Sequence, residues 1–517
     1  MNMGSYRNPI LTGFHPDPTI CRVGEDYYLA TSSFEYFPGV PLFHSRDLAH
    51  WRPIGHALTR RSQLDLSRIG SSSGIFAPTL RHFGGKFYLF TTNVGGGGHF
   101  YVTADTPESP WSEPVPIEGP GFDPDIFVDH DGTAYFCRED MEKGGIHQWR
   151  LDLTTGRLLG EERVIWTGHE DRLCEGPHLY RIGEWYVLLA AEGGTHRGHM
   201  VVAGRSRSPK GPFESCPHNP ILTQRGRVHH PIQATGHGDL VQDTQGRWWM
   251  VFLGIRPVQR YYNASHHLGR ETFLAPVFFQ DGWPVVNGGH AIELAMKADL
   301  PPAHPWPAPP VRDDFAGSEL DSCWNFRFNP DPASWSLRER RGWLRLHGLA
   351  RTLDEPSAQA FVGRRQQHFH CRATALLEFT PGRAGEEAGL CVLMNERHHA
   401  EVFLARGAAG VELCVRRRIG DLSAVLAQRP WSAPRVIIEV RANEHDWSLG
   451  YIEEAGEFRP LAGASTHYLS SEVAGGFTGT YIGMFATGSG KPASAPADFD
   501  WLDYKAEGSD ITTPICS

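Results

Sequence analysis

The chain of 517 residues is predicted to be all-β, a five-bladed β-propeller followed by a β-sandwich. Three observations support this class. The chain holds 57 Gly and 38 Pro, more than an average protein, which favours many short strands joined by turns. An aromatic strand preceded by a tight turn recurs along its first half. No helical period of any length is present.

The repeat defines the propeller. Five segments each join a turn containing Gly to a short aromatic strand, at residues 24–29, 84–89, 131–136, 183–189 and 245–250. Their aromatic anchors are Tyr28, Tyr88, Tyr135, Tyr186 and Trp249, spaced 60, 47, 51 and 63 residues apart. This period is too long for a solenoid coil and suits a four-stranded propeller blade with variable loops. Five units predict a propeller domain over residues 1–300.

A change of composition marks the end of the repeats. Residues 301–310, PPAHPWPAPP, contain six prolines and are predicted to form a stiff, extended linker. Beyond them, short alternating strands such as residues 343–346 and 435–440 predict a β-sandwich domain over residues 311–517.

Five side chains occupy equivalent places in the repeat. Each lies 11 or 12 residues before its aromatic anchor, and they are Asp17, Phe76, Asp123, Glu175 and His237. The innermost strand of every blade lines one central channel, so these positions are expected to converge. Asp-Pro and Glu-Gly pairs are also common in turns, and a single histidine is often a core residue. Turn chemistry does not require acids on three blades, so the register favours a functional cluster.

Converging carboxyl groups beside aromatic rings suit glycoside hydrolysis. One acid must protonate the leaving oxygen, and one carboxylate must activate water or attack carbon. Other classes of function are disfavoured by composition. A net charge of −10 without a basic stretch argues against nucleic acid and anionic membranes as partners, and no apolar run is long enough to span a membrane.

The expected location is the cytoplasm. The N-terminus has no basic region followed by an apolar one, so no signal peptide is predicted. Nine cysteines, from Cys21 to Cys516, form no CxxC pair and no disulfide framework, which predicts reduced thiols.

At these residues the chain resembles glycoside hydrolase family 43, the β-xylosidases and α-L-arabinofuranosidases. The resemblance covers almost the full length and is carried by NPILTGFHPDPTI, SSFEYFPGVPLFHSRDL, GIFAPTLR, GFDPDIF, EGPHLY, ATGHGDLV and HHLGRETFLAPV. The tail, from VRDDFAGSELDSCWNF onward, resembles the concanavalin A-like sandwich domain of the longer members. Such a resemblance implies the propeller-plus-sandwich fold predicted above.

The resemblance also implies an inverting mechanism with three acids. Asp17 matches the general base, Glu175 the general acid, and Asp123 the acid that orients Glu175 and, as an anion, raises its pKa. Asp125 stands where members usually carry a small residue, and the Phe-Asp-Pro context favours Asp123 over it.

Further positions match the sugar pocket. Phe34 and Phe76 match its aromatic walls, although many members carry Trp at the second position, which leaves the preferred sugar open. Arg270 matches an arginine that binds sugar hydroxyls, and Phe477 is expected to reach from the sandwich domain to close the pocket. His237 matches a channel histidine that in some members helps to hold calcium, so a structural Ca²⁺ stays open, while no cofactor is required.

The favoured function is therefore an exo-acting hydrolase that releases terminal β-D-xylosyl or α-L-arabinofuranosyl units from hemicellulose-derived oligosaccharides. A fructan or sucrose hydrolase shares the same plan, but the chain carries only a distant echo of its motifs. A non-catalytic sugar-binding propeller is the third reading, and retention of three acids argues against it. The sequence leaves open whether the protein is a monomer or a homo-oligomer.

Overall fold

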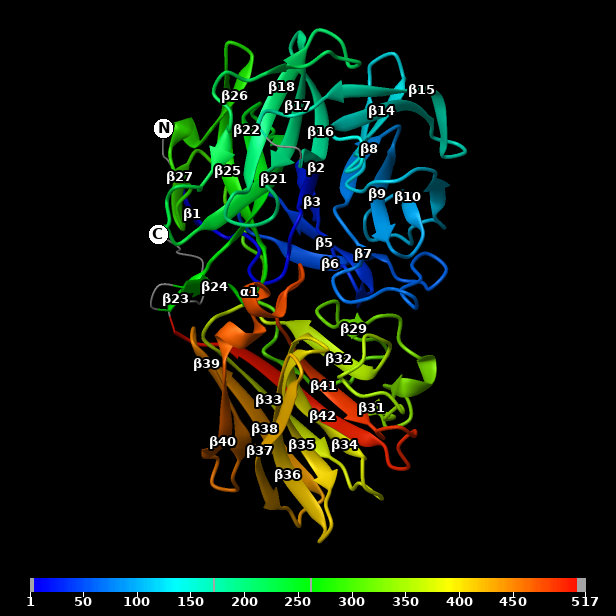
Figure 1. Ribbon diagram of the computed structural model, residues 1–517, viewed down its shortest axis with the longest axis vertical. Coiled ribbons are helices and arrows are strands. Elements are labelled where there is room, and N and C mark those ends of the chain that lie inside the picture. The colour runs from blue at the N-terminus through cyan, green and yellow to red at the C-terminus, as the bar shows by residue number, and fades with distance from the viewer. Residues whose placement is uncertain (1–3, 171–172, 261–262, 509–517) are drawn as a thin grey trace.

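The computed structural model describes residues 4–170, 173–260 and 263–508 and has two parts (Figure 1). The propeller lies at the top of the view and the sandwich at the bottom. The predicted all-β class is confirmed: in the described residues the α-helical content is one short turn, α1 (Ser471–Ala474). The first three and last nine residues, which include Cys516, fall outside the described part. No helix among the described residues has the length and apolarity needed to cross a membrane.

Five antiparallel sheets form the blades. Their strands, grouped by blade and in chain order, are β2 (Thr19–Val23), β3 (Asp26–Ala30), β5 (Gly39–Ser45) and β6 (Arg52–Leu58); β7 (Gly74–Ile75), β8 (Thr79–Phe83), β9 (Lys86–Val94), β10 (Gly98–Ala104) and β11 (Val115–Ile117); β12 (Asp125–Val128), β13 (Ala134–Glu139), β14 (Ile146–Asp152) and β15 (Arg157–Trp166); β16 (Glu175–Ile182), β17 (Trp185–Glu192), β18 (Met200–Ser206), β19 (Glu214–Ser215) and β20 (Leu222–Thr223); β21 (Gln233–Gln242), β22 (Trp248–Ile255), β25 (Glu271–Gln280) and β26 (Trp283–Val286). The predicted aromatic strands are β3, β9, β13, β17 and β22.

The innermost strands close a ring. In space β2 contacts β8, β8 contacts β12, β12 contacts β16, β16 contacts β21, and β21 returns to β2. Each innermost strand pairs with the aromatic strand of its own blade. The aromatic strands are largely buried because each blade packs between two others.

The N-terminal segment fastens the last blade. β1 (Gly4–Arg7) pairs with β27 (Ala295–Ala298). The Asn8 side chain donates to the Leu274 carbonyl (3.0 Å) and accepts from the Leu274 N–H (2.9 Å). Its amide thereby forms with β25 the two hydrogen bonds that a neighbouring strand would form. The two ends of the propeller sequence therefore meet on the fifth blade.

The proline-rich segment, residues 301–310, has no regular secondary structure and lies along the first blade. The His304 N–H donates to Asp47 (2.6 Å), and the Arg52 guanidinium stacks on the Trp306 ring at 4.2 Å. These contacts fix the linker to the propeller.

The sandwich consists of two antiparallel sheets packed on one apolar core. One sheet contains β28 (Arg312–Asp313), β30 (Trp335–Ser336), β31 (Leu344–Leu346), β33 (Cys371–Glu378), β38 (Arg435–Ala442), β39 (Asp446–Ile452), β40 (Phe458–Ser465) and β42 (Ala497–Ala506). The other contains β32 (Ala360–Arg365), β34 (Glu387–Asn395), β35 (His398–Arg406), β36 (Val411–Ile419), β37 (Leu422–Pro430) and β41 (Tyr481–Thr487).

The two parts share a buried interface. β4 (Tyr36–Phe37) of the propeller pairs with β29 (Phe326–Arg327) from the second part of the chain. The rings of Tyr36 and Tyr481 stack with centroids 3.8 Å apart, and both are fully buried. Residues of the sandwich domain are thereby held beside the propeller mouth.

Candidate active site

The five equivalent positions lie near the starts of the innermost strands. Asp17 and Asp123 stand two residues before β2 and β12, Phe76 stands three residues before β8, and Glu175 is the first residue of β16. His237 differs, because it lies inside β21, within the second of its two register shifts. These β-bulges re-aim the backbone, which is a common use of bulges next to active sites.

An unusual backbone conformation recurs at these positions. Asp17, Asp123 and His237 have φ of 52°, 51° and 50°, and on the fourth blade Gly176, next to Glu175, has φ of 56°. Positive φ is uncommon for residues other than Gly and costs about 1–3 kcal/mol when strained, a cost typically found at functional sites. A Cβ at position 176 would lie 2.7 Å from the His237 ring, so only Gly allows this approach.

Asp17 is held by two donors. The Ser32 hydroxyl donates to Oδ2 at 2.6 Å, and Arg270 Nη1 donates to Oδ1 at 2.9 Å. Arg270 Nη1 also donates to Thr195 Oγ1 at 3.0 Å. The Nε of Arg270 is buried and has no hydrogen-bond partner among the described residues. This donor is therefore left over for a group outside the chain.

Glu175 has the pKa that a general acid needs. Its pKa is raised from 4.5 to about 7, because burial and then the charge of Asp17 raise it while Arg270 opposes both. Asp123 lies close enough to Glu175 for each carboxyl group to influence the protonation of the other. Burial, with the charges of Glu175 and Asp17, raises the pKa of Asp123 itself well above its ordinary value.

The cluster includes a fourth carboxyl group that the sequence repeat does not predict. Glu139, the last residue of β13, is 3% exposed, and neither carboxyl oxygen has a hydrogen-bond partner among the described residues. Burial and then the charge of Glu175 raise its pKa to about 8. Its charge in turn raises the pKa of Asp123. It belongs to an aromatic strand rather than to the repeated position, so nothing in the repeat indicated it.

Three phenylalanine rings contact one another beside Arg270. The centroids of Phe34 and Phe76 lie 5.0 Å apart, and those of Phe34 and Phe477 lie 5.8 Å apart. Arg270 lies over the rings of Phe34 and Phe477, with its guanidinium carbon 5.5 and 5.7 Å from their centroids. The carbonyl of Phe477 accepts from Arg270 Nη2 at 3.4 Å. Phe477 of the sandwich domain therefore lies beside Arg270 and Phe34 of the propeller, as expected.

Asp125 belongs to a different network. Arg81 of the second blade donates to Asp125 of the third (3.1 Å) and to Asp239 of the fifth (2.8 Å), and contacts His178 Nδ1 of the fourth (3.0 Å). Thr19 of the first blade donates to Asp239 at 2.7 Å. All five blades therefore meet around one guanidinium, and Asp125 is a structural partner in it. Asp123, two residues earlier, carries the contacts to the carboxyl cluster.

The residues around His237 do not fit a calcium cage. Calcium takes six to eight oxygen ligands, chiefly carboxylates. The two carboxylates at the propeller centre, Asp125 and Asp239, are already paired with Arg81. Burial lowers the pKa of His237 to about 4, and its Nδ1 lies 3.9 Å from Asp123. The imidazole is thus neutral and faces the carboxyl cluster.

Chelation is accordingly expected to have no effect. Dialysis of the protein against EDTA, followed by activity and melting-temperature measurements with and without added CaCl2, is expected to give unchanged kcat/KM and Tm. Arg81 already binds the two carboxylates at the propeller centre. A loss on chelation that Ca²⁺ restores and Mg²⁺ does not would contradict this reading of the channel.

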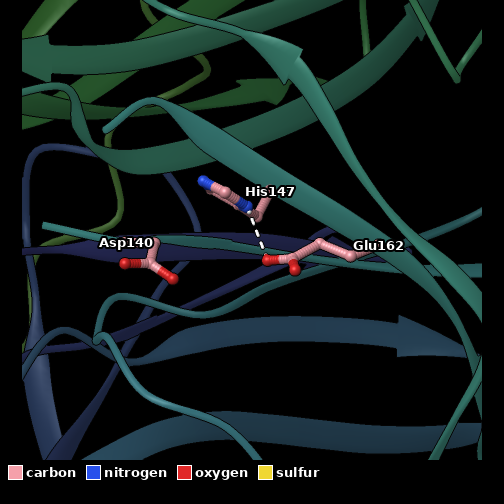
Figure 2. Close-up of side chains that lie close together, drawn as sticks. All are labelled: Asp140, His147 and Glu162. Carbon is pink, nitrogen blue, oxygen red and sulfur yellow. Dashed lines mark hydrogen bonds and ion pairs between the residues drawn. The ribbon is translucent and has the colours of Figure 1, made fainter. Parts of the chain in front are cut away.

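A second group of potential ligands lies on the third blade. Asp140, His147 and Glu162 of the third blade have ligand atoms within 4.8 Å of one another (Figure 2). Their charges are already matched within the chain, because Lys143 donates to Glu162 (2.6 Å) and Arg138 lies 3.5 Å from Asp140. His147 itself binds Glu162 at 2.7 Å, as the dashed line in Figure 2 marks. We interpret the group as a structural ion-pair network.

Comparison with known proteins identifies the family. The model of glycosyl hydrolases family 43 matches residues 6–284, and that of the β-xylosidase C-terminal concanavalin A-like domain matches residues 312–505. A non-reducing end α-L-arabinofuranosidase of Bacteroides ovatus is 43% identical over 97% of this chain and 95% of its own. A xylan 1,3-β-xylosidase of a Vibrio species is 36% identical over 97% of this chain and 99% of its own. The solved Bacteroides ovatus xyloglucan PUL GH43B structure superposes with a TM-score of 0.94 at 42% identity, covering 98% of this chain and 100% of that one. The chain therefore belongs to glycoside hydrolase family 43 and is a glycoside hydrolase with the family's concanavalin A-like C-terminal domain.

Proposed function

We propose that this enzyme releases single terminal β-D-xylosyl or α-L-arabinofuranosyl units from hemicellulose-derived oligosaccharides, with inversion of configuration. The observation that carries the proposal is the pairing of two differently held carboxyl groups. Glu175 has a pKa of about 7, while Asp17 is fixed by Arg270 and Ser32. Glycoside hydrolysis requires one carboxyl group that acts as acid and a second that acts as base or nucleophile.

The proposed chemistry follows from this difference. Asp17 accepts a proton from a water molecule whose oxygen attacks the anomeric carbon. Glu175 gives its proton to the glycosidic oxygen, which leaves with the electron pair of the broken C–O bond. Asp123, whose own pKa is raised by burial and by the charge of Glu175, orients Glu175. Both protons are thereby accounted for in one displacement.

The proposed exo action rests on the pocket walls. Phe34, Phe76 and Phe477 contact one another beside Arg270, whose Nε lies buried without a partner from the described chain. A sugar hydroxyl would satisfy this donor, and the ring faces would pack on the apolar face of the sugar. A pocket closed by Phe477 accepts a chain end rather than an internal unit.

The proposed sugar classes follow the relatives. One of the similar proteins above is named an arabinofuranosidase and another a xylosidase. Phe76, where many relatives have Trp, is smaller and leaves both pentoses as candidates. Hydrolysis of p-nitrophenyl β-D-xyloside or α-L-arabinofuranoside would distinguish a hydrolase of this class from a sugar-binding propeller or a fructan hydrolase, which would cleave neither.

The stereochemical outcome tests the mechanism. Inversion needs room for a water molecule, with the two carboxyl groups roughly 6.5–9.5 Å apart, against about 5–5.5 Å in retaining enzymes. We expect the wider separation between Asp17 and Glu175. A proton NMR time course with an aryl β-xyloside should therefore show α-xylose first, before mutarotation. Initial release of β-xylose would contradict the assignment of Asp17 as base.

A further inference from the structure

We propose that Ser72 is a positioning residue for the sugar pocket: it holds the sandwich-domain loop that carries Phe477 against the propeller. The inference rests on the proposed function, because it assigns Phe477 to the wall of that pocket. Ser72 lies on the segment between the first and second blades and touches none of the catalytic candidates itself. Its effect on a substrate would pass through Phe477.

Two hydrogen bonds place Ser72 between the domains. The N–H of Phe477 donates to Ser72 Oγ at 2.9 Å, and the N–H of Ser72 donates to Glu35 Oε2 at 3.0 Å. Ser72 has φ of 60°, a conformation that turns its backbone N–H toward Glu35 while its hydroxyl faces the loop. A Cβ at position 476 would lie 2.3 Å from Ser72 Oγ, so Gly476 is what allows the loop to come this close.

The propeller side of this contact is rigid. Glu35 is fully buried and follows Phe34, the ring that faces Phe477 across the pocket. The backbone of Phe34 exchanges two hydrogen bonds with Ile75 (2.9 and 3.1 Å), and the Glu35 carbonyl accepts from Phe328 at 2.7 Å. Ser72 therefore ties both opposing rings of the pocket to one fixed segment.

The neighbouring residue, Ser71, is held by the second part of the chain. Arg327, fully buried, donates to Ser71 Oγ at 2.6 Å, and Ser71 Oγ donates to Glu396. Residues 71 and 72 thus contact the sandwich side at two points. The segment has little freedom to follow Phe477 if that loop moves.

The loop itself has few other restraints. Phe477 follows Gly475 and Gly476, which have φ of 72° and 81°. Glycine is conformationally permissive, so these two residues restrain the loop only weakly. The ring is 39% exposed, and the other hydrogen bond to Phe477 in the described structure is the long one from Arg270, at 3.4 Å. Regular bonding resumes only at Thr480, whose N–H donates to His267. Ser72 Oγ is therefore the short anchor of the ring's backbone.

Kinetics of Ser72→Ala test the proposal. Losing one hydrogen bond of ordinary strength corresponds to a change of about fivefold in binding. We expect KM for the p-nitrophenyl glycoside, and the inhibition constant of the free pentose it releases, to rise together by about fivefold, with kcat within about twofold of wild type. The matched control is Ser73→Ala, because the Ser73 side chain makes no hydrogen bond in the described part of the chain. It should keep the wild-type KM.

A double variant separates positioning from general stability. If Ser72 acts through the Phe477 ring, then Ser72→Ala should add no further rise in KM to Phe477→Ala. Gly476→Ala places a Cβ against Ser72 Oγ and should raise KM as Ser72→Ala does. It replaces Ser72→Ala in this test if Ser72→Ala folds poorly. An unchanged KM in Ser72→Ala, or additive effects in the double variant, would overturn the proposal. Failure of the proposed function would show differently, as a wild-type protein that cleaves neither glycoside.

Discussion

Glu175→Ala is expected to lose about 10²–10⁴-fold of its rate on xylo- or arabino-oligosaccharides, and much less on an aryl glycoside. A sugar alkoxide is a poor leaving group and needs the proton that Glu175 supplies. A nitrophenolate is far less basic and departs with little help. Steady-state rates of the variant on both substrate types, each relative to wild type, measure the difference.

Asp17→Ala is the matched comparison. It removes the group that activates water, which every substrate needs, so its loss should be large and equal on both substrate types. Equal losses in the two variants whatever the leaving group would contradict the division into acid and base. Small, equal losses in both would point to a binding or structural role for the whole cluster.

The pH profile checks the same assignment. Glu175 must be protonated to act, and its pKa in the folded protein is raised to about 7. Activity of the wild type on oligosaccharides should therefore decrease as the pH is raised through about 7. Lowering the pH through the same range should not decrease it. In Glu175→Ala this limb should be absent from the residual activity on the aryl glycoside.

Much of this site could be predicted because the fold repeats. Turns and aromatic strands depend on the conformational preferences of residues close together in the sequence. The five blades can therefore be predicted from the sequence alone. Once a propeller was assumed, register alone brought Asp17, Asp123 and Glu175 to one mouth. These inferences need no knowledge of side-chain environment.

What could not be predicted depends on environment. Glu139 lies at the end of an aromatic strand and joins the cluster only because β13 packs against the next blade. The repeat predicts that Glu175 and Asp123 lie together, but not that burial is the largest cause of the raised pKa of each. Such balances depend on which groups lose water in the folded state.

Arg81 illustrates the same limit. In the sequence it is one arginine in APTLR, with nothing to separate it from the others. In the fold it meets Asp125 and Asp239, both fully buried, from two other blades. Although burial opposes it, the charge of Arg81 is the largest influence that holds the pKa of Asp239 below its ordinary value. Two buried carboxylates thus depend on one cation.

Arg81→Met is therefore expected to destabilise the protein by about 3–5 kcal/mol, because removing one partner of a buried ion pair leaves uncompensated charge. Asp239 must then be charged without a cation beside it or take up a proton at neutral pH, and both cost free energy. Urea unfolding of the full chain at pH 7, followed by tryptophan fluorescence, should show a much lower transition midpoint. The control is Arg181→Met, whose partly exposed pair with Asp129 is worth about 0–1 kcal/mol. Adding Asp239→Asn to Arg81→Met should recover part of the loss, since it removes one buried charge at the same site. A midpoint for Arg81→Met equal to that of Arg181→Met would show that the propeller closes without its central cation.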